Sequence, residues 1–301
     1  MSKEDWGLVT LPTSGDPEKL AIARLKEASK MSFEIYDSPL IVTTSGGKDS
    51  SVCVELARRA GIPFEVQHNH TTADAPETVQ FVRQEFARIE NFGISCKINY
   101  PYYKGKRTSM WNLIPQKLMP PTRLHRYCCG VLKEHGGVKR FVATGIRWDE
   151  SPKRAHNRGI FETYTWSKKD KLVQKNEDSD VDVFALCKPA AKHMVNPIVD
   201  WTEAQVWDFL RDAKIPVNPL YQCGVSRVGC ILCPLACKKR RYEEMRRWPA
   251  YERLYTKTFD RMLENRKLKG KPTTWQNGRD VFRWWMEEDV LPGQLSWENF
   301  T

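Results

Sequence analysis

The first half of the chain alternates short β-branched apolar runs with amphipathic stretches, and this alternation constrains the fold more than any other feature. Residues 39–44 read PLIVTT and residues 64–70 read FEVQHNH, whereas residues 49–60 between them carry apolar side chains at helical spacing. Strands that alternate with helices at this spacing form a parallel sheet with helices on both faces. We therefore expect an α/β fold with a doubly wound parallel sheet.

The loop between the first strand and the first helix of this series has the features of a phosphate-binding site. It reads Ser45-Gly46-Gly47-Lys48-Asp49-Ser50. Glycines let the backbone approach an anion closely, and the first amides of a helix have no partner within the helix. Those amides, the helix dipole and the Lys48 ammonium suit a diphosphate. The spacing is not that of a Walker A loop. An ordinary strand-to-helix turn with an Asp or Ser cap is the alternative interpretation.

Residues after a later expected strand, at residues 140–146, add to this site. Gly145 and Arg147 lie at its carboxyl end, where α/β sheets bind ligands, and Arg154 and Arg158 follow. A guanidinium binds phosphate or sulfate through two parallel hydrogen bonds. Arg147 is the stronger candidate, whereas Arg158 is also consistent with an ordinary surface arginine.

The composition favours an anionic ligand and excludes a membrane-spanning protein. The chain has 48 Lys and Arg against 37 Asp and Glu, a formal net charge of +11. This excess suits nucleotide, nucleic acid or an anionic surface without choosing among them. No apolar run approaches the ~20 residues of a membrane-spanning helix, and the N-terminal residues show no secretory signal. We expect a cytoplasmic protein with no membrane partner, in which thiols stay reduced.

Clustered cysteines in a reducing compartment indicate a metal or redox site. One possible ligand set is local: Cys223, Cys230, Cys233 and Cys237. The other joins the adjacent Cys128 and Cys129 to Cys230 and Cys233. Adjacent cysteines chelate a single tetrahedral zinc with strain, whereas a four-iron cluster offers each thiolate its own iron, which favours the second set. A zinc ribbon is a third possibility. The remaining Cys53, Cys96 and Cys187 fit buried structural thiols, and Lys133 could lend positive charge to a cluster.

Several ordered motifs resemble one known family. They are Ser45–Ser50, Ala75-Pro76-Glu77-Thr78, Gly145-Ile146-Arg147 with Glu150-Ser151 and Arg154, Asn196–Thr202, Ile215–Tyr221, and Gly229-Cys230-x-x-Cys233. Together they resemble the phosphoadenosine phosphosulfate (PAPS) reductase family, within the adenine nucleotide α-hydrolase-like superfamily, whose pyrophosphatase loop (PP-loop) cleaves ATP between the α and β phosphates. The resemblance runs from about residue 38 to residue 235.

The resemblance implies an adenine nucleotide, ATP or a relative of it, together with Mg²⁺. The nucleotide-binding residues it implies are Ser45, Gly46, Gly47, Lys48, Asp49, Ser50, Gly145, Arg147 and Arg154. Of these, Lys48, Asp49 and Arg147 are the expected catalytic residues. The cysteine pattern is similar to that of the adenylylsulfate (APS) reductase branch, which implies a [4Fe-4S] cluster on Cys128, Cys129, Cys230 and Cys233, with Cys223 and Cys237 as alternative ligands.

Two departures from the family bear on the reaction. Assimilatory reductases carry a reactive cysteine near the C-terminus, but no cysteine follows Cys237 here, and SGGKDS keeps the fuller ATP-cleaving form of the loop. Both favour the branch that resembles DNA phosphorothioation sulfurtransferases, with ATP-dependent adenylation and sulfur transfer. Cys223 or Cys237 would then be a candidate sulfur carrier. A sulfur-donor or electron-donor protein is a further expected partner. APS or PAPS reduction, and a nucleic-acid-binding or regulatory protein that retains the pocket, are the alternatives.

These observations divide the chain into three parts. We expect an N-terminal helical segment (1–37), a PP-loop nucleotide-binding α/β domain (38–222), and a cysteine motif with a basic helical C-terminal region (223–301). In the last part, the run Lys238–Arg241 with Arg246, Arg247 and nearby aromatic residues suits nucleic-acid contact, or a solvated helix face. Trp284 and Trp285 are expected to pack in the core.

Overall fold

The computed structural model describes residues 15–134, 136–137, 139–164, 171–174 and 192–287. The chain divides into two compact units. Unit 1 comprises residues 1–69, 76–99 and 136–228, and unit 2 comprises residues 70–75, 100–135 and 229–301. In this division residues 70–75 and 100–135 group with residues 229–301, whereas residues 15–37 group with the α/β residues.

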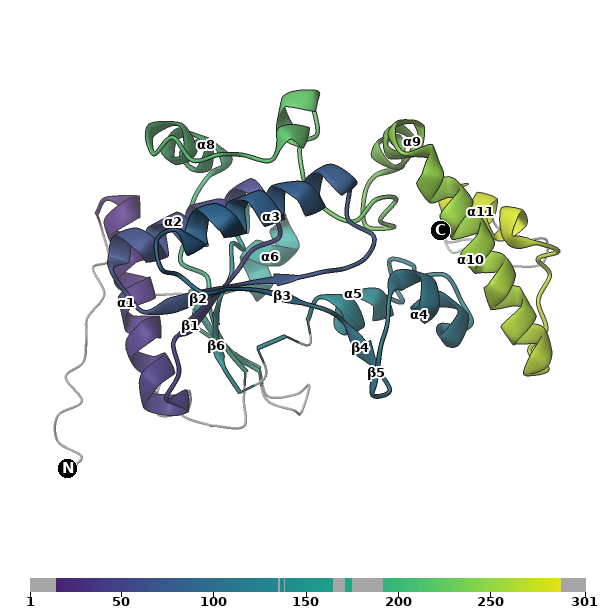
Figure 1. The fold of residues 1–301 in the computed structure, drawn as a ribbon, viewed down its shortest axis with the longest axis horizontal. Helices are drawn as coiled ribbons and strands as arrows, with labels where there is room; N and C mark the ends of the chain where they lie inside the picture. Colours follow the sequence, from purple (N-terminus) through teal and green to yellow (C-terminus); the bar gives the residue numbers. More distant parts are fainter. Residues whose placement is uncertain (1–14, 135, 138, 165–170, 175–191, 288–301) are drawn as a thin grey trace. The chain divides into compact units, whose positions relative to one another are not determined.

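Unit 1 contains a mainly parallel sheet (Figure 1). Within the described residues it has seven strands, in the order β3 (Cys96–Asn99), β2 (Phe64–Asn69), β1 (Leu40–Thr43), β6 (Phe141–Ala143), β9 (Lys192–Val195), β7 (Phe161–Tyr164) and β8 (Lys171–Gln174). The first five are parallel to one another, and β7 pairs antiparallel with β9 on one side and with β8 on the other. The α/β class and the strands expected in the first half of the chain are confirmed.

The strand order places the phosphate loop at a topological switch point. From β1 the chain moves outward through β2 and β3, and it then returns to the other side of β1 to form β6 and β9. Ligands of α/β sheets bind at the carboxyl ends of the strands where the order reverses in this way. The loop after β1 and the turn after β6 both lie there, so the fold brings two motifs about a hundred residues apart to one edge.

The described helices of unit 1 are α1 (Pro17–Tyr36), α2 (Lys48–Ala60), α3 (Pro76–Glu90), α6 (Pro152–Asn157) and α8 (Glu203–Asp212), with the 3₁₀ turns η1 (Trp148–Glu150) and η2 (Pro219–Cys223). Side chains cap α1, α6 and α8, whereas α2 begins at Gly47 without a side-chain cap. Asp16 caps α1 by accepting from the Glu18 amide at 2.9 Å. Thr202 caps α8 with Gln205 in a reciprocal capping box.

The core of unit 1 follows the alternation of β1. Leu40 and Val42 belong to the main apolar cluster, which also takes in residues of α1, α2, α3 and α8. Ile41 points to the opposite side of the strand and packs with Val142 and Met194. A strand buried on both sides is the expected consequence of a continuous apolar run in a parallel sheet.

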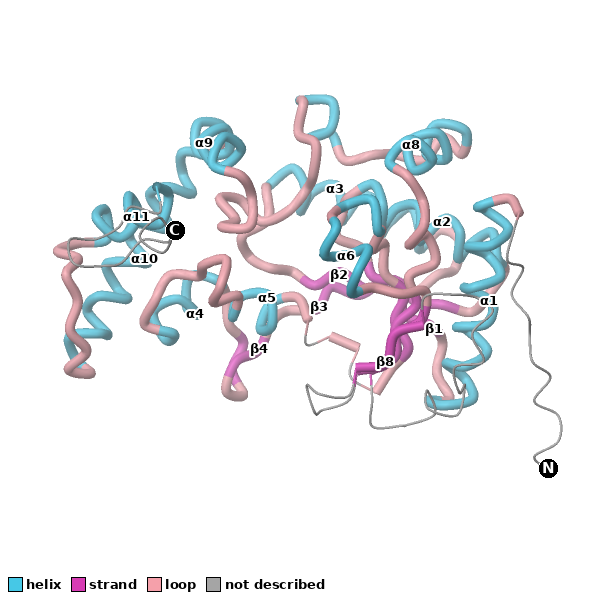
Figure 2. Tube along the Cα trace, turned by 180° about the vertical axis from the view of Figure 1, so that it is seen from behind, coloured by secondary structure: helices cyan, strands magenta, loops and turns pink. Residues whose placement is uncertain are grey.

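Unit 2 is mainly helical, as Figure 2 shows. Its elements are the hairpin of β4 (Tyr102–Tyr103) and β5 (Lys106–Arg107), and the helices α4 (Met110–Lys117), α5 (Tyr127–Leu132), α9 (Lys238–Arg247), α10 (Pro249–Leu268) and α11 (Gly278–Glu287). Trp285 is 2% exposed, its ring lies 4.7 Å from that of Tyr255, and its indole donates to the Pro121 carbonyl at 2.6 Å. The prediction that Trp285 packs in the core is confirmed.

None of the described helices is both long enough and apolar enough to cross a bilayer.

Candidate functional site

The phosphate loop is held in shape by its own polar side chains. Gly46 has φ +73°, and a Cβ there would lie 2.9 Å from a methyl group of Val82, so the position requires glycine. The Ser50 hydroxyl donates to the Gly47 carbonyl at 2.8 Å and accepts from the Ser45 amide at 3.2 Å. These hydrogen bonds stabilise the conformation that the loop has in the structure.

Tyr221 and Asn218, from the segment at η2, contact the same loop. The Lys48 amide, the first of α2, donates to the Tyr221 hydroxyl at 2.9 Å. Burial raises the pKa of Tyr221 to about 12, so the phenol is neutral. Asn218 donates to the Gly46 carbonyl at 3.1 Å. The Tyr221 oxygen thus accepts a hydrogen bond at the start of α2, where an anion's oxygen would otherwise bind.

Two buried cations meet three carboxylates beside the loop. Arg147, 1% exposed, contacts Asp49 at 2.6 Å, Asp149 at 3.1 Å and Glu203 at 3.3 Å. The Lys48 ammonium lies 3.2 Å from Asp49 and 3.6 Å from Glu203. Asp149 and Glu203 are about half exposed. Carboxylate oxygens in such a group are the ligands that Mg²⁺ takes beside phosphate, so these acids could hold it.

The structure therefore brings Arg147 to Lys48 and Asp49, as the sequence analysis expects, but holds it in ion pairs. Asp149 and Glu203 were missed. A hydrogen bond from the Glu203 amide, and then Arg147, lower the pKa of Asp149. Their signal was weak: Asp149 stands two residues after Arg147, and Glu203 is the first residue of a capped helix.

Gly145 and Arg154 occupy different positions around this site. A Cβ on Gly145 would lie 2.8 Å from the Asp49 carbonyl carbon, so the turn after β6 packs directly on the start of α2. Arg154 forms an ion pair with Glu150, and burial lowers the pKa of its guanidinium. Glu150 also lies 3.4 Å from Arg227. Gly145 shapes the loop, and Arg154 contacts an acid on η1 rather than the loop.

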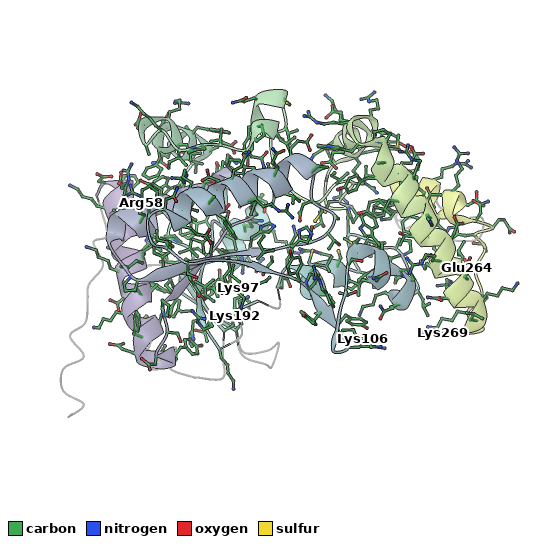
Figure 3. All side chains as sticks on the ribbon, in the orientation of Figure 1. Arg58, Lys97, Lys106, Lys192, Glu264 and Lys269 are labelled. Atoms are coloured by element: carbon green, nitrogen blue, oxygen red, sulfur yellow. The ribbon has the colours of Figure 1, made fainter. Side chains whose placement is uncertain are left out.

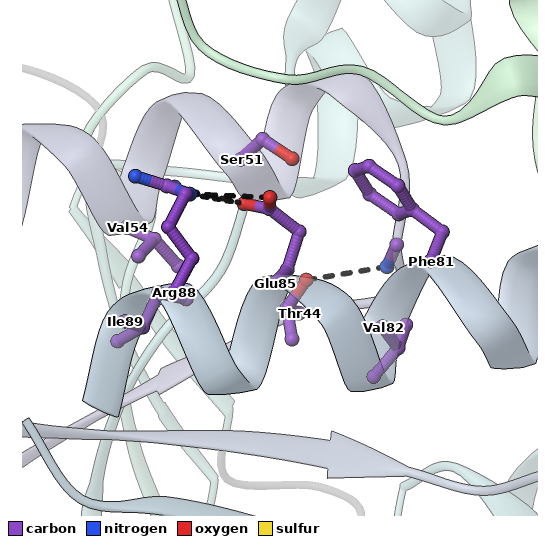
Figure 4. A pocket seen from close by; sticks show the side chains of 9 residues that line it. Thr44, Ser51, Val54, Phe81, Val82, Glu85, Arg88 and Ile89 are labelled. Atoms are coloured by element: carbon purple, nitrogen blue, oxygen red, sulfur yellow. Dashed lines mark hydrogen bonds and ion pairs between the residues drawn. The ribbon is translucent and has the colours of Figure 1, made fainter. Parts of the chain in front are cut away.

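A small cavity lies behind the loop, between α2 and α3 (Figure 4). Its walls are formed by Thr44, Gly46, Ser51, Val54, Phe81, Val82, Glu85, Arg88 and Ile89. Glu85 and Arg88 pair with each other at 2.8 Å along one side. The volume of about 10 Å³ holds one water at most, so this cavity is not a nucleotide site.

The four cysteines of the favoured set all lie in unit 2 and interact with one another. Cys128 and Cys129 belong to α5, and a hydrogen bond with Cys128 lowers the pKa of Cys129. The same bond, burial, and the charges of Cys129, Cys230 and Cys233 raise the pKa of Cys128. Burial raises the pKa of Cys230 to about 11. The charges of these thiols act on one another, which places the four side chains near one another in unit 2.

Residues 70–75 fix the position of the second cysteine pair. Asp74 and Cys230 form an antiparallel β-bridge, and the Ile231 amide donates to the Ala73 carbonyl at 2.8 Å. The Cys230 thiol donates to the Thr71 hydroxyl at 3.5 Å. This short segment therefore orients Cys230 by backbone pairing.

Two cations face the thiols. Arg126 donates to the Cys129 sulfur at 3.7 Å. The charge of Cys230 is the largest cause that raises the pKa of Lys133, followed, after the opposing effect of burial, by Asp74, Cys233 and Cys129. Lys133 was singled out from the sequence, whereas Arg126 was missed, although it stands only two residues before Cys128. Both would offset the charge of a thiolate-bound cluster.

The other described cysteines differ in exposure and in the unit to which they belong. Cys223 ends η2 in unit 1, whereas Cys237 precedes α9 in unit 2, and both are exposed. Cys53 is buried in α2, and burial raises the pKa of Cys96 to about 12, in keeping with structural thiols. Cys187 lies outside the described residues.

The basic run at residues 238–247 is partly internal. Arg241 is 2% exposed, and its guanidinium lies 4.6 Å from the Trp285 ring centre. Lys238 pairs with Glu287, and Arg240 pairs with Glu244 at 2.7 Å. Arg241 is therefore internal to unit 2, and two more of the six cations in this run pair with acids, which weakens the interpretation of the run as a solvated nucleic-acid surface.

Comparison with known proteins identifies the family of the chain. A sequence model of the phosphoadenosine phosphosulfate reductase domain matches residues 39–236, from the start of β1 past the second cysteine pair. The chain belongs to this family. An uncharacterized protein of Methanocaldococcus jannaschii is 28% identical over 223 residues, which cover 72% of this chain and 46% of that protein.

Two relatives of this chain have names that state an activity. Adenosine 5'-phosphosulfate reductase of Allochromatium vinosum is 26% identical over 237 residues, covering 75% of this chain and 77% of the relative. Sulfate adenylyltransferase subunit 2 of Bacteroides thetaiotaomicron is 28% identical over 228 residues, covering 68% and 69%. By contrast, the chain spans less than half the length of the M. jannaschii relative.

Proposed function

We propose that this chain is an iron–sulfur enzyme of the PAPS reductase family that adenylates an acceptor with ATP and then passes sulfur to it. The observation that carries the proposal is the network of Lys48, Arg147 and Asp49 around a glycine-rich loop at the switch point of the sheet. The four cysteines Cys128, Cys129, Cys230 and Cys233, which lie together in unit 2, support the second part of the proposal.

The loop suits the phosphates of an adenine nucleotide. The amides at the start of α2 point to an anion site, and the Tyr221 hydroxyl that now accepts from the Lys48 amide would give way to a phosphate oxygen. Mg²⁺ would bind the phosphates together with oxygens of Asp49, Asp149 and Glu203. Arg147 would hold these acids in place from behind, as a positioning residue.

Adenylation would proceed by attack of an acceptor oxygen on the α-phosphorus of ATP. The bond to the bridging oxygen breaks, and pyrophosphate leaves with that oxygen. Lys48 and the loop amides would offset the charge that develops on the leaving group. The outer sulfur of a persulfide on a donor protein would then attack the adenylated acceptor and displace AMP. A thiol would reduce the resulting disulfide, which leaves that sulfur on the acceptor in place of the activated oxygen.

A [4Fe-4S] cluster would bind Cys128, Cys129, Cys230 and Cys233 and would supply redox or sulfur chemistry to this reaction. Arg126 and Lys133 would balance its negative charge, and the Thr71 hydroxyl would hydrogen-bond to the Cys230 sulfur. Charges and hydrogen bonds beside the ligating sulfurs tune the properties of such centres. Cys237 is the exposed thiol of unit 2 outside this set and a candidate sulfur carrier.

Sulfonucleotide reduction is the second candidate, and the similarity to the A. vinosum reductase favours it. That reaction would bind APS or PAPS at the same loop and transfer the sulfo group to a thiol, with loss of the nucleotide. A second thiol would then release sulfite as a disulfide forms. Residues 238–301 contain no cysteine, so a thiol at another position or on a partner protein would take part in that reaction.

Product analysis separates the two reactions. We expect anaerobically purified protein to release pyrophosphate from ATP with Mg²⁺, and Lys48→Ala and Asp49→Asn to abolish the release. Lys97→Ala, on an exposed strand residue of unit 1, should leave it unchanged. Sulfite release from APS with a thiol donor, without pyrophosphate release from ATP, would favour reduction. The absence of both pyrophosphate and sulfite would contradict both candidates.

A further inference from the structure

The β4–β5 hairpin of unit 2 carries charges that the fold does not require. Tyr102 pairs with Arg107 and Tyr103 pairs with Lys106 across it. The two-residue turn is Lys104-Gly105, with φ +52° and +75°. Asn or Gly suits the first of these left-handed positions better than Lys does. A lysine at this point is therefore not explained by the turn.

Cations from three elements gather around Tyr103. The Lys117 ammonium, from α4, lies 4.5 Å from the centre of the Tyr103 ring. Lys117, Lys104 and Lys269, the residue after α10, together lower the pKa of Tyr103. Lys106 and Arg107 add two more charges on β5. Lys106 and Lys269 are both labelled in Figure 3 on the outside of unit 2.

These five cations lack internal counter-charges. Within the part of the chain that the structure describes, no ion pair joins a carboxylate to Lys104, Lys106, Arg107, Lys117 or Lys269. The basic run of α9 differs, since Lys238 and Arg240 pair with acids there. Unneutralised charge of one sign at a surface attracts a polyanion.

Aromatic rings stand between these charges. Tyr102 is 58% exposed. Arg107 stacks on the neighbouring Tyr100, with its guanidinium carbon 3.7 Å from the ring centre. An acidic peptide would use the cations alone, whereas a nucleic acid single strand uses cations for its phosphates and exposed rings for its bases.

We propose that this surface, formed by residues 100–107 with Lys117 and Lys269, binds single-stranded nucleic acid. The cations contact phosphates, and the exposed face of Tyr102 stacks on a base. The surface is distinct from the nucleotide loop of unit 1, so the proposal does not depend on the reaction proposed above.

Fluorescence anisotropy with the full chain tests the proposal. The probes are labelled oligo(U) and oligo(dT) of about 20 nucleotides, longer than the roughly 4–16 that one such site covers. We expect affinity to fall with salt. The double variant Lys104→Asn/Lys106→Gln should lower the slope of log K against log salt by about 1.4, for two lost phosphate contacts at about 0.7 each. Asn at position 104 removes the charge and still suits a positive φ.

A second variant separates stacking from charge. Tyr102→Ala should weaken binding by about tenfold without changing the salt slope. The matched control is Lys19→Gln/Lys97→Gln, which removes two exposed charges from unit 1 and should change neither quantity. Binding of either oligonucleotide with these variant effects supports the proposal, and a preference for oligo(U) points to the 2'-hydroxyl.

Three results would overturn it. One is the absence of salt-dependent binding by the wild type. Another is an equal loss of slope in the hairpin and control variants. The third is binding of labelled poly-glutamate that is as tight as that of the oligonucleotides and equally sensitive to Lys104→Asn/Lys106→Gln, which would assign the surface to an acidic polypeptide. Circular dichroism of each variant, with an unchanged thermal midpoint, confirms that the fold is intact.

Discussion

The Arg147 guanidinium and the Asp49 carboxylate lie 2.6 Å apart, between Nε and Oδ1, and this contact joins the turn after β6 to the first turn of α2. The two residues are 98 positions apart in the chain. Since Arg147 also contacts Asp149 and Glu203, one buried side chain sets the arrangement of three acids at the candidate nucleotide site.

Removal of Arg147 should therefore cost stability as well as activity. Arg147→Ala removes the cation that Asp49, Asp149 and Glu203 share, and since two of these acids are half exposed we expect a loss of about 2 kcal/mol in the free energy of unfolding, measured by urea denaturation. Arg211→Ala, which breaks the exposed pair with Asp208, should cost less than about 1 kcal/mol. Equal losses in the two variants would show that the Arg147 network does not stabilise the fold.

A single methyl group at position 145 should disturb the phosphate loop. In Gly145→Ala the new Cβ would meet the Asp49 backbone at 2.8 Å, and overpacking of this kind costs about 1–3 kcal/mol. We expect weaker ATP binding by calorimetry. Gly15→Ala is the control, since a Cβ there meets no atom within 4 Å. Unchanged ATP affinity in Gly145→Ala would mean that the loop does not bind the phosphates.

The stability of α2 should depend on pH through Glu55. Burial raises the pKa of this carboxyl, but hydrogen bonds from Arg58 and Arg59 outweigh it and hold the pKa below its ordinary value. A depressed folded pKa stabilises the fold above the unfolded pKa, and that stabilisation is lost as the pH falls. Glu55→Gln should lose about 1 kcal/mol at neutral pH, and the difference from wild type should shrink below about pH 4.

Denaturation across this pH range provides the measurement for Glu55. The control is Glu34→Gln, on the exposed pair with Lys30, which should show less than about 0.5 kcal/mol at either pH. A difference for Glu55→Gln that stays constant from neutral to acid pH would argue against the ionised carboxylate as its cause.

Most of the α/β unit could be predicted because its signals are local. The alternation around Leu40–Thr43 and the capped start of α8 at Thr202 depend on neighbouring residues alone. The assignment of residues 100–135 to unit 2 depends on distant contacts instead, such as the bond from Trp285 to the Pro121 carbonyl and that from Arg266 to the Leu118 carbonyl. No local pattern carries that information.

The candidate sites follow the same division. The glycine-rich loop and the paired cysteines are contiguous motifs, so the sequence indicates them directly. Glu203 reaches the loop from a helix that begins more than 150 residues later, and it looks like an ordinary exposed acid in the sequence. Arg241 lies within a basic run that suggests a solvated face, yet its contact with Trp285 buries it. Tertiary packing decides both cases.

Metal analysis of the anaerobically purified protein tests the central claim most directly. The account predicts four iron and four acid-labile sulfide per chain, lost in Cys129→Ser and retained in Cys96→Ser and Cys237→Ser. Cys96 is a matched control, since it lies on β3 of unit 1. Zinc in place of iron, or iron that is lost only in Cys237→Ser, would contradict the ligand set of Cys128, Cys129, Cys230 and Cys233.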